Sequence, residues 1–344
     1  MDPDHKNRLV ILMPVFNDWH ALALLLPALD QALESSRLAM GSPQQIDVLL
    51  VNDGSTQPPE PGLLTQNYQH LRSVQILHLR RNLGHQRAIA VGLVHIYSNW
   101  PCVGVVVMDG DGEDRPRDVA RLIEEFRRHG QRTIIFAERA KRLEKLSFRL
   151  SYWLYRTTHF LLTGVRVRVG NFSVVPWQAV ERLVIVSEIW NHYAAAIFRA
   201  RLPYLTIPMD RGPRMTGESK MNFASLLVHG FSSIAVFSDI VSTRLLVVAS
   251  GLTATLAALT GGMLLFSWGA HLRVPAWAAY LGGVLLVILA QAVIGSFLLA
   301  FSILSARSNL TFVPLRDTPH YLDRVEQVFP HDNLSIPRLR AEAV

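Results

Sequence analysis

Cysteine and charge are scarce in ways that restrict what this chain can be. Its 344 residues include a single cysteine, Cys102, which excludes an internal disulfide framework and agrees with a reducing compartment. Charged residues are missing from 245–268 and from 274–306. As a helix the first run would be about 36 Å long, enough to cross a bilayer core of about 30 Å. We therefore predict two membrane-spanning helices joined by a turn at 269–273; two buried helices of a soluble core are the alternative.

Several familiar signatures are missing too. The first apolar run continues as PVFNDW, without the glycines of a dinucleotide-binding fold, and GxxxxGK[ST] occurs nowhere. The string DGDGED fits the first positions of an EF-hand calcium loop, but the glycine position falls on Asp114. The N-terminal stretch LVILMPVF is short, is broken by Pro14 and is followed by Asp18, so we do not expect a signal peptide.

The charge balance is basic, with a net charge of +7, a pI of about 9.8 and a mean hydropathy of +0.22. This balance suits an anionic membrane surface or anionic substrates, and no RNA- or DNA-binding signature occurs, so we expect no nucleic acid partner. Two spans would return the chain to its starting side. There Arg244, Arg307, Arg316 and Arg324 outnumber Arg273 in the turn, which predicts the cytoplasmic side for both flanking parts.

The first part of the chain alternates between two kinds of segment. Short runs rich in Val, Ile and Leu predict strands at 8–15, 46–52, 74–79, 102–108 and 133–137. The intervening segments predict helices at 19–37, 63–70, 85–98 and 116–128. This alternation predicts an α/β fold, with a mostly parallel sheet covered by helices on both faces. Ligands of such sheets bind at the carboxyl ends of the strands, where Asp53, Asp109 and Asp111 fall.

Two further segments, 146–162 and 221–241, look amphipathic. Either they face the core, or they lie in the headgroup layer with aromatic side chains in the membrane and arginines at the phosphates. Their proximity to the two spans favours the second interpretation.

The stretch VMDGDGED sets four acidic residues at the end of a buried strand. Because carboxylates repel one another, this arrangement calls for a positive partner. Mg²⁺ or Mn²⁺ takes one or two protein carboxylates and completes its shell with phosphates and water. The turn therefore predicts a divalent cation held against a diphosphate.

Six segments, in order, resemble the motifs of family 2 glycosyltransferases with the GT-A fold. They are ILMPVFND, LLVNDGST, LRRNLGHQRAIAVGL, VVVMDGDGEDRP, GNFSVVP and RGPRMTGESK. More narrowly, they resemble polyprenyl-phosphate glycosyltransferases, the group that includes the dolichyl-phosphate mannose synthases. The resemblance extends to about residue 305. The sequence departs from the family at three positions: Asn52 replaces an Asp, Glu113 replaces a Gln, and Asn171 stands where many relatives have Asp.

The resemblance implies a function and a set of site residues. It implies metal-dependent, inverting transfer of a sugar from a nucleotide-diphosphate-sugar to a polyprenyl (undecaprenyl or dolichyl) phosphate in the membrane. The implied nucleotide-binding residues are Pro14, Phe16, Asp18, Asn52, Asp53, Gly84, Asp109 and Gly110. The implied ligands of Mg²⁺ or Mn²⁺ are Asp109, Asp111 and Glu113. The implied acceptor-phosphate residues are Arg139, Arg214, Ser219 and Lys220. The implied catalytic residues are Asp109, Asp111, Arg139, Arg211, Arg214 and Lys220.

Structural roles remain alternatives for several of these residues. Asp18 fits a helix N-cap, Asp53 a turn former and Asp114 a helix start. The basic loop fits an ordinary solvated loop.

We expect a GT-A catalytic domain at 1–220, an amphipathic interface helix at 221–243, two membrane helices at 244–306 and a cytoplasmic tail at 307–344. The expected location is a bacterial inner membrane. The protein could form a homo-oligomer. A processive polysaccharide synthase and a non-catalytic nucleotide-sugar sensor or scaffold are the competing functions.

Overall fold

The computed structural model describes residues 7–40, 45–139, 146–165, 169–216, 223–270, 275–306 and 312–330. The chain divides into two compact units. The first, here called the sheet unit, comprises Met1–Arg149, Val167–Val236 and Phe312–Val344. The second, the helical unit, comprises Leu150–Arg166 and Phe237–Thr311.

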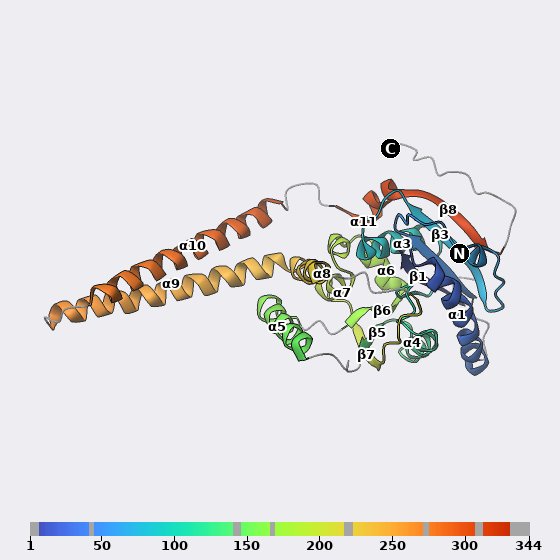
Figure 1. Ribbon diagram of the computed structural model, residues 1–344, viewed down its shortest axis with the longest axis horizontal. Coiled ribbons are helices and arrows are strands. Elements are labelled where there is room, and N and C mark those ends of the chain that lie inside the picture. Colours follow the sequence, from blue (N-terminus) through green and yellow to red (C-terminus); the bar gives the residue numbers. More distant parts are fainter. Residues whose placement is uncertain are drawn as a thin grey trace. The chain divides into compact units, whose positions relative to one another are not determined.

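The sheet unit is built around one eight-stranded sheet of order β7-β5-β6-β4-β1-β2-β3-β8 (Figure 1). Its strands are β1 (Arg8–Val15), β2 (Gln45–Asn52), β3 (Leu71–Leu79), β4 (Gly104–Val107), β5 (Ile134–Arg139), β6 (Val169–Pro176), β7 (Tyr204–Met209) and β8 (Leu322–Phe329). Strands β4, β1, β2 and β3 run parallel, and β5 is parallel to β7. Strand β6 is antiparallel to both β4 and β5, and β8 is antiparallel to β3. The sheet is thus mixed but mostly parallel, as the alternating pattern predicts.

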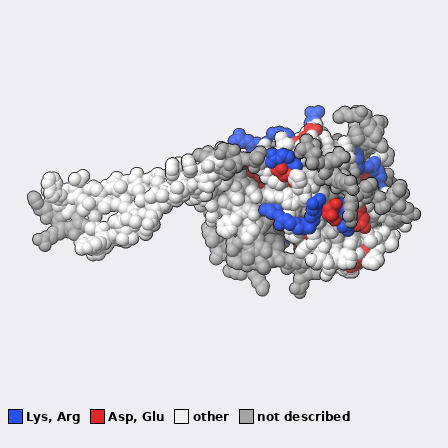
Figure 2. Space-filling view, turned by 90° about the horizontal axis from the view of Figure 1, so that it is seen from above, with Lys and Arg blue, Asp and Glu red and all other residues white. Residues whose placement is uncertain are grey.

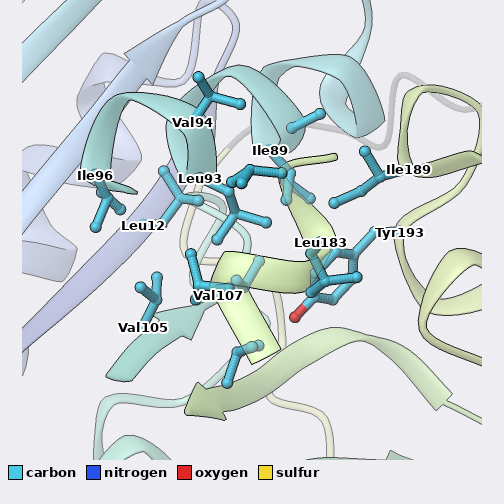
Figure 3. Close-up of a cluster of buried hydrophobic side chains, with 14 of the residues drawn as sticks. Leu12, Ile89, Leu93, Val94, Ile96, Val105, Val107, Leu183, Ile189 and Tyr193 are labelled. Atoms are coloured by element: carbon cyan, nitrogen blue, oxygen red, sulfur yellow. The ribbon is translucent and has the colours of Figure 1, made fainter. Parts of the chain in front are cut away.

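Helices cover both faces of this sheet. The helices of the sheet unit are α1 (Trp19–Met40), α2 (Pro61–Leu64), α3 (His85–Asn99), α4 (Pro116–Arg128), α6 (Trp177–Leu183), α7 (Tyr193–Arg199), α8 (Phe223–Ala235) and α11 (Pro314–Asp317), with 3₁₀ turns at Ser187–Trp190 and Thr318–Tyr321. Alternate residues of β1 enter different cores, because successive side chains of a strand point to opposite faces. Val10 and Leu12 pack with α3, α6 and α7 in the cluster of Figure 3, whereas Leu9 and Ile11 pack with α1 and α4.

Several elements differ from those that the sequence pattern predicts. The helix expected at 63–70 is only the four residues of α2, and the N–H groups of Gln69 and His70 donate to the Asp30 carboxylate instead of forming a helical turn. Strands β6, β7 and β8 were not among the predicted strands. Strand β7 shows no strong apolar pattern, because all but one of its residues are at least partly exposed.

The C-terminal part of the chain returns to the sheet unit. Strand β8 pairs with β3 along Val74–Leu79 and so covers what would otherwise be the edge of the parallel sheet. Val328 of this strand is only 2% exposed and belongs to the core shared by α1 and α4. Residues 322–329 of the tail, to which the sequence pattern assigned no structural role, are therefore part of the sheet.

The helical unit contains α5 (Leu146–Thr163), α9 (Ser238–Gly269) and α10 (Ala276–Ala306). Helices α9 and α10 lie side by side and contain the two candidate membrane spans, Ser238–Gly269 and Ala276–Ile303, whose mean hydropathies are 1.7 and 2.6. Within these spans at most 6% of the most apolar window is buried, unlike the core helix of a soluble protein. Figure 2 shows the difference: blue and red side chains gather on the sheet unit, whereas the described part of the α9–α10 pair is white along most of its length.

The amphipathic segment at 221–241 is not one helix. Residues 221 and 222 lie outside the described residues, α8 ends at Ala235, and α9 begins at Ser238. The two residues between them, Val236 and Phe237, are 4% and 2% exposed. The burial of this pair explains why the apolar periodicity continues through a break in the backbone. The other amphipathic segment does form one helix, α5, from Leu146.

Removing β8 should destabilise the sheet unit. A chain that stops after Thr311 leaves the edge of β3 unpaired and forfeits the burial of Val328, worth about 1.5–3 kcal/mol by itself. We expect a lower thermal unfolding midpoint and more aggregation on size exclusion in detergent. A chain that stops after Pro330 keeps the strand and is the matched control; equal behaviour of the two truncations would contradict a structural role for β8.

Candidate functional site

The candidate residues gather at one edge of the sheet. Strands β4, β1 and β2 are neighbours and run parallel, so their carboxyl ends lie together. Asp109 follows β4, Asp18 follows β1, and Asp53 follows β2. The strand order reverses on either side of β1, and in open α/β sheets such a point is where ligands bind. Arg139, the last residue of β5, reaches the same edge through its backbone, but its side chain lies outside the described residues.

Asp53 fixes the turn that follows β2. Its carboxylate accepts hydrogen bonds from the backbone N–H groups of Leu83 and Gly84, at 2.6 and 2.8 Å, and its own N–H donates to the carbonyl of Val15 at 2.8 Å. Burial raises the pKa of this carboxyl to about 6, against the lowering effects of the two N–H donors and of Arg87. The side chain is only 2% exposed, so the geometry favours the turn-forming role over direct contact with a ligand.

A second turn, after β1, is tied to the first by a residue that sequence reasoning missed. Asn17 adopts a left-handed conformation, with φ of 56°. Its side-chain oxygen accepts hydrogen bonds from the N–H groups of Thr56 and Gln57, at 2.9 and 3.1 Å. Its own N–H donates to the hydroxyl of Ser55 at 2.9 Å. The sequence did contain a sign of this turn, namely an Asn directly after Phe16, because Asn tolerates the left-handed conformation better than most residues.

The residues predicted to frame the nucleotide lie around these two turns. Pro14 is buried within β1, and Phe16 is half-buried just after it. Gly110 lies against β1: a Cβ added there would come 3.4 Å from the carbonyl oxygen of Pro14. Asp18 is half-buried, and its Oδ1 lies 3.4 Å from Nη2 of Arg214.

The acidic turn after β4 is closed by its own members. The Asp114 carboxylate accepts a hydrogen bond from the N–H of Asp109 at 3.0 Å, and Asp111 Oδ1 accepts from the N–H of Glu113 at 3.0 Å. Gly112, between them, has a φ of 80°, which a residue with a side chain rarely adopts. Asp114 therefore shapes the turn, in agreement with its structural alternative.

Asp111 lies in an unfavourable electrostatic position. Burial, followed by repulsion from Asp109 and Asp18, raises the pKa of its carboxyl to about 6, while Arg211 and Arg214 act in the opposite direction. Arg214 Nη2 is 3.8 Å from Asp111 Oδ2, a distance typical of an ion pair and too long for a hydrogen bond. The two arginines thus offset the carboxylate charge only in part.

The basic loop runs along the acidic turn. The N–H of Gly212 donates to the carbonyl of Glu113 at 2.8 Å, and the N–H of Met215 donates to the carbonyl of Asp111 at 3.1 Å. The guanidinium of Arg211 forms an ion pair with the Glu113 carboxylate. The loop thus brings Arg211 and Arg214 to the acids, about a hundred residues earlier in the chain.

Ser219 and Lys220, also predicted for this loop, lie outside the described residues.

Another missed residue, Gln86, supports Asp109 from the opposite side. Asn171 of β6 donates to Asp109 Oδ1 at 3.4 Å, and Gln86 Nε2 donates to Asn171 Oδ1 at 3.0 Å. The carbonyl oxygen of the Gln86 side chain accepts from the N–H of Tyr193 at 2.6 Å, and Gln86 is 7% exposed. The amide of Asn171 can therefore donate to Asp109 and accept from Gln86. Relatives in the resembled family often carry an acid at this position. The signal for Gln86 was its position as the second residue of α3, directly before a long apolar stretch of this helix.

A small cavity lies between these groups. It is lined by Asp109, Glu113, Asp114, Arg115, Asp118, Ala137, Gly170, Asn171, Phe172, Met209, Asp210 and Arg211. Among the described residues, no group of three or more His, Cys, Asp and Glu side chains is arranged to hold a metal ion. Magnesium needs only one or two protein carboxylates. The mutual repulsion of Asp109 and Asp111, relieved only in part by arginine, fits such a cation, whereas Glu113 is already paired with Arg211.

Comparisons with known proteins agree on one family. The model of Glycosyl transferase family 2 matches residues 10–183. An uncharacterized glycosyltransferase of Synechocystis sp. is 22% identical over 232 residues, 67% of this chain and 69% of the relative.

Two relatives have names that state an acceptor. The undecaprenyl-phosphate 4-deoxy-4-formamido-L-arabinose transferase of Edwardsiella ictaluri is 26% identical over 63% of this chain and 64% of its own length. The dodecaprenyl-phosphate galacturonate synthase of Rhizobium johnstonii is 23% identical over 52% of this chain and 50% of its own.

Gly112→Ala should disturb the acidic turn. A Cβ there would meet the side chain of Met215 at 2.5 Å, in addition to the strain of a positive φ. The contact between the turn and the basic loop should loosen, and nucleotide affinity should fall roughly tenfold, the equivalent of about 1.4 kcal/mol. Gly130→Ala is the control, because Gly130 has a φ of 68° and open space around its Cβ. Equal affinities of the two variants, measured by titration calorimetry, would contradict the importance of this contact.

Asp53 should make stability depend on pH. Its folded pKa of about 6 exceeds the ordinary 3.8, so the folded state binds the proton more tightly. The resulting stabilisation is complete below about pH 4 and is lost as the pH rises through 6, by on the order of 2–3 kcal/mol at about 1.4 kcal/mol per pKa unit. Raising the pH from 4 to 7 should therefore lower the thermal unfolding midpoint of the wild type relative to that of Asp53→Asn, which does not titrate at this position. A difference independent of pH would show that the carboxyl titrates normally.

Proposed function

Because the chain belongs to glycosyltransferase family 2 and is a glycosyltransferase, we propose that it transfers a sugar from a nucleotide-diphosphate-sugar to a polyprenyl monophosphate in a membrane. The observation that carries this proposal is the acidic turn after β4. There Asp109 repels Asp111, and Arg211 and Arg214 offset this repulsion in part, at the edge of the sheet where ligands of this fold class bind. A cluster of both signs suits a substrate that carries phosphates.

The acceptor is inferred from two independent features. The names of two relatives include undecaprenyl phosphate and dodecaprenyl phosphate. The chain also joins its sheet unit to two helices, α9 and α10, that are long and apolar enough to cross a membrane. Such an anchor would keep the enzyme at the membrane, where the tail of the acceptor stays in lipid.

The donor is proposed to bind at the turns after β1 and β2. Pro14, Phe16 and Asp18 would frame the base, next to the segment Asn52–Gly54, while Gly84 and Gly110 form the adjacent walls. Asp53 contributes by holding Leu83 and Gly84 in place.

Phosphates would be handled at the acidic turn. Asp109 and Asp111, with Glu113 nearby, would hold Mg²⁺ or Mn²⁺, which offsets negative charge on the departing nucleoside diphosphate. Arg211 is positioned beside the same turn through its contact with Glu113. Guanidinium groups match phosphate oxygens geometrically, so Arg211 and Arg214 would exchange carboxylate partners for phosphate when the donor binds.

The reaction itself needs little help from a base. The second pKa of a phosphate monoester is about 6, so the acceptor is largely a dianion at pH 7. Its oxygen would attack the anomeric carbon, forming one C–O bond while the bond to the nucleoside diphosphate breaks, with inversion. We propose Arg139, Arg214, Ser219 and Lys220 as ligands of the acceptor phosphate. Catalysis then rests on positioning and charge.

The orientation in the membrane is also proposed. In the sequence, Arg244, Arg307, Arg316 and Arg324 lie in the segments that flank the two candidate spans, against Arg273 in the segment that connects them. By the positive-inside rule the sheet unit faces the cytoplasm, in bacteria at the inner membrane.

A reconstitution assay tests the proposed function. Purified protein in detergent is incubated with labelled nucleotide-sugars, Mg²⁺ and polyprenyl phosphate, and label extractable into organic solvent is counted. We expect such a product with one class of donor. Nucleotide binding without product from any donor would favour the sensor, and a polymeric product would favour the processive synthase.

Asp111→Asn should reduce turnover by about 10²–10³-fold, the effect of removing one charged contact that stabilises a transition state. Chelation of divalent cations should have a comparable effect on the wild type. Glu124→Gln, on the exposed face of α4 where Glu124 pairs with Arg128, is the control and should leave turnover unchanged. Full activity of Asp111→Asn, or of the chelated enzyme, would contradict the proposed role of the turn.

A further inference from the structure

A chain of three hydrogen bonds connects the C-terminal strand to the turn after β2. Glu326 Oε2 of β8 lies 2.9 Å from His78 Nε2, and His78 Nδ1 lies 3.0 Å from Asn52 Nδ2. Asn52 Oδ1 accepts a hydrogen bond from the N–H of Ser55 at 2.9 Å. His78 and Asn52 are 5% and 8% exposed, so the bond between them is shielded from water, whereas the Glu326 side chain is 37% exposed.

The strand register places these residues. Asn52 and His78 are direct partners in the parallel pair β2–β3. Glu326 pairs with Ile76 in the antiparallel pair β3–β8, and is therefore the diagonal neighbour of His78. The contact thus requires β8 in its observed register.

The direction of each hydrogen bond in the chain is fixed by the next. The N–H of Ser55 can only donate, so the oxygen of the Asn52 amide faces Ser55 and its NH₂ group faces His78. An NH₂ group also only donates, so Nδ1 of His78 must accept and carries no proton. The ring proton then resides on Nε2 and is donated to the Glu326 carboxylate.

This order explains the amide at position 52, where the resembled family carries an acid. A carboxylate at 52 has no proton to donate to Nδ1 of His78. It would place the imidazole between two acids, at 52 and 326, and would change the tautomer or charge of the ring. Asn52, His78 and Glu326 therefore form a matched set.

Strand β8 is connected by hydrogen bonds to both turns of the proposed donor site. Besides its bond to Asn52, Ser55 accepts a hydrogen bond through its hydroxyl from the N–H of Asn17 at 2.9 Å. Asn17 in turn accepts from Thr56 and Gln57. Fixing the Asn52 amide therefore fixes the turn after β2 together with the turn after β1.

We propose that Glu326 and His78 are positioning residues for nucleotide binding, and that β8 acts through them to complete the donor pocket. This inference rests on the proposed function in one respect, that the turns after β1 and β2 bind the nucleotide. A purely structural tie between β8 and β3 would affect stability and leave nucleotide affinity alone.

Nucleotide titration of the full-length protein tests the inference. UDP and GDP are titrated separately by calorimetry, and KM is measured for the sugar donor and for polyprenyl phosphate. Glu326→Ala should weaken nucleotide binding and raise the donor KM by roughly 3- to 10-fold, as expected for one hydrogen bond. The KM for the acceptor should not change. Glu326→Gln keeps an oxygen that accepts from Nε2 and should restore most of the affinity.

Asp323→Ala is the matched control. It removes a carboxylate from the same strand, where Asp323 is half exposed and pairs with the adjacent Arg324. We expect wild-type affinity from this variant. Nucleotide affinities of Glu326→Ala and Asp323→Ala that are equal would overturn the inference.

A double variant adds a second criterion. If Glu326, His78 and Asn52 act through one series of hydrogen bonds, Glu326→Ala should lower the nucleotide affinity of the Asn52→Ala variant only slightly. If the fold-changes of the two single variants multiply in the double variant, the residues act independently and the inference is overturned. Should Glu326→Ala fail to fold, His78→Phe tested against Asn52→Ala provides the same comparison.

The two proposals fail separately. Normal sugar transfer with wild-type affinity in Glu326→Ala overturns only the role of β8. Absence of sugar transfer in the wild type, with the expected pattern of nucleotide affinities, overturns only the proposed function.

Discussion

Repulsion between carboxylates at the carboxyl edge of the sheet is the constraint around which this site is built. Asp109, Asp111 and Asp18 follow two adjacent parallel strands, and burial, followed by repulsion from Asp109 and Asp18, raises the pKa of Asp111. Such an arrangement persists only where cations are supplied. The basic loop supplies them as Arg211 and Arg214, held against the acidic turn by backbone hydrogen bonds. Because the compensation is partial, the site is suited to a substrate that brings both phosphates and a divalent ion.

The two walls of the site are stabilised by different means. On one side, Gln86 and Asn171 form a buried amide relay to Asp109. On the other, Asp53 binds two backbone N–H groups, and Asn52 is oriented from β8. Amides and a neutral imidazole serve here because they position neighbours without adding charge to an edge that is already acidic. This accounts for the amides at 52 and 171, where relatives of the resembled family carry or often carry acids.

Sequence reasoning succeeded where the pattern is local. The predicted strands at 8–15, 46–52 and 74–79 all lie within observed strands, because alternation and β-branched content are properties of a few adjacent residues. The helix predicted at 63–70 is only the single turn of α2, and strand β7 was not predicted because it is largely exposed. The break between α8 and α9 was missed because Phe237 keeps the helical spacing of apolar residues and is buried, as is its neighbour Val236.

The order of the motifs, the lengths of the charge-free runs and the acidic turn follow from sequence alone, and they suffice to indicate the family, the fold and the kind of chemistry. Which side chains meet is decided by the tertiary structure. Glu326 reaches His78 across 248 residues, and Arg214 reaches Asp18 across 196. No local propensity encodes such pairs, because they depend on strand order and register. The same reason explains why the backbone partners of Asp53 are Leu83 and Gly84, about 30 residues further along the chain, which the turn-forming alternative by itself does not specify.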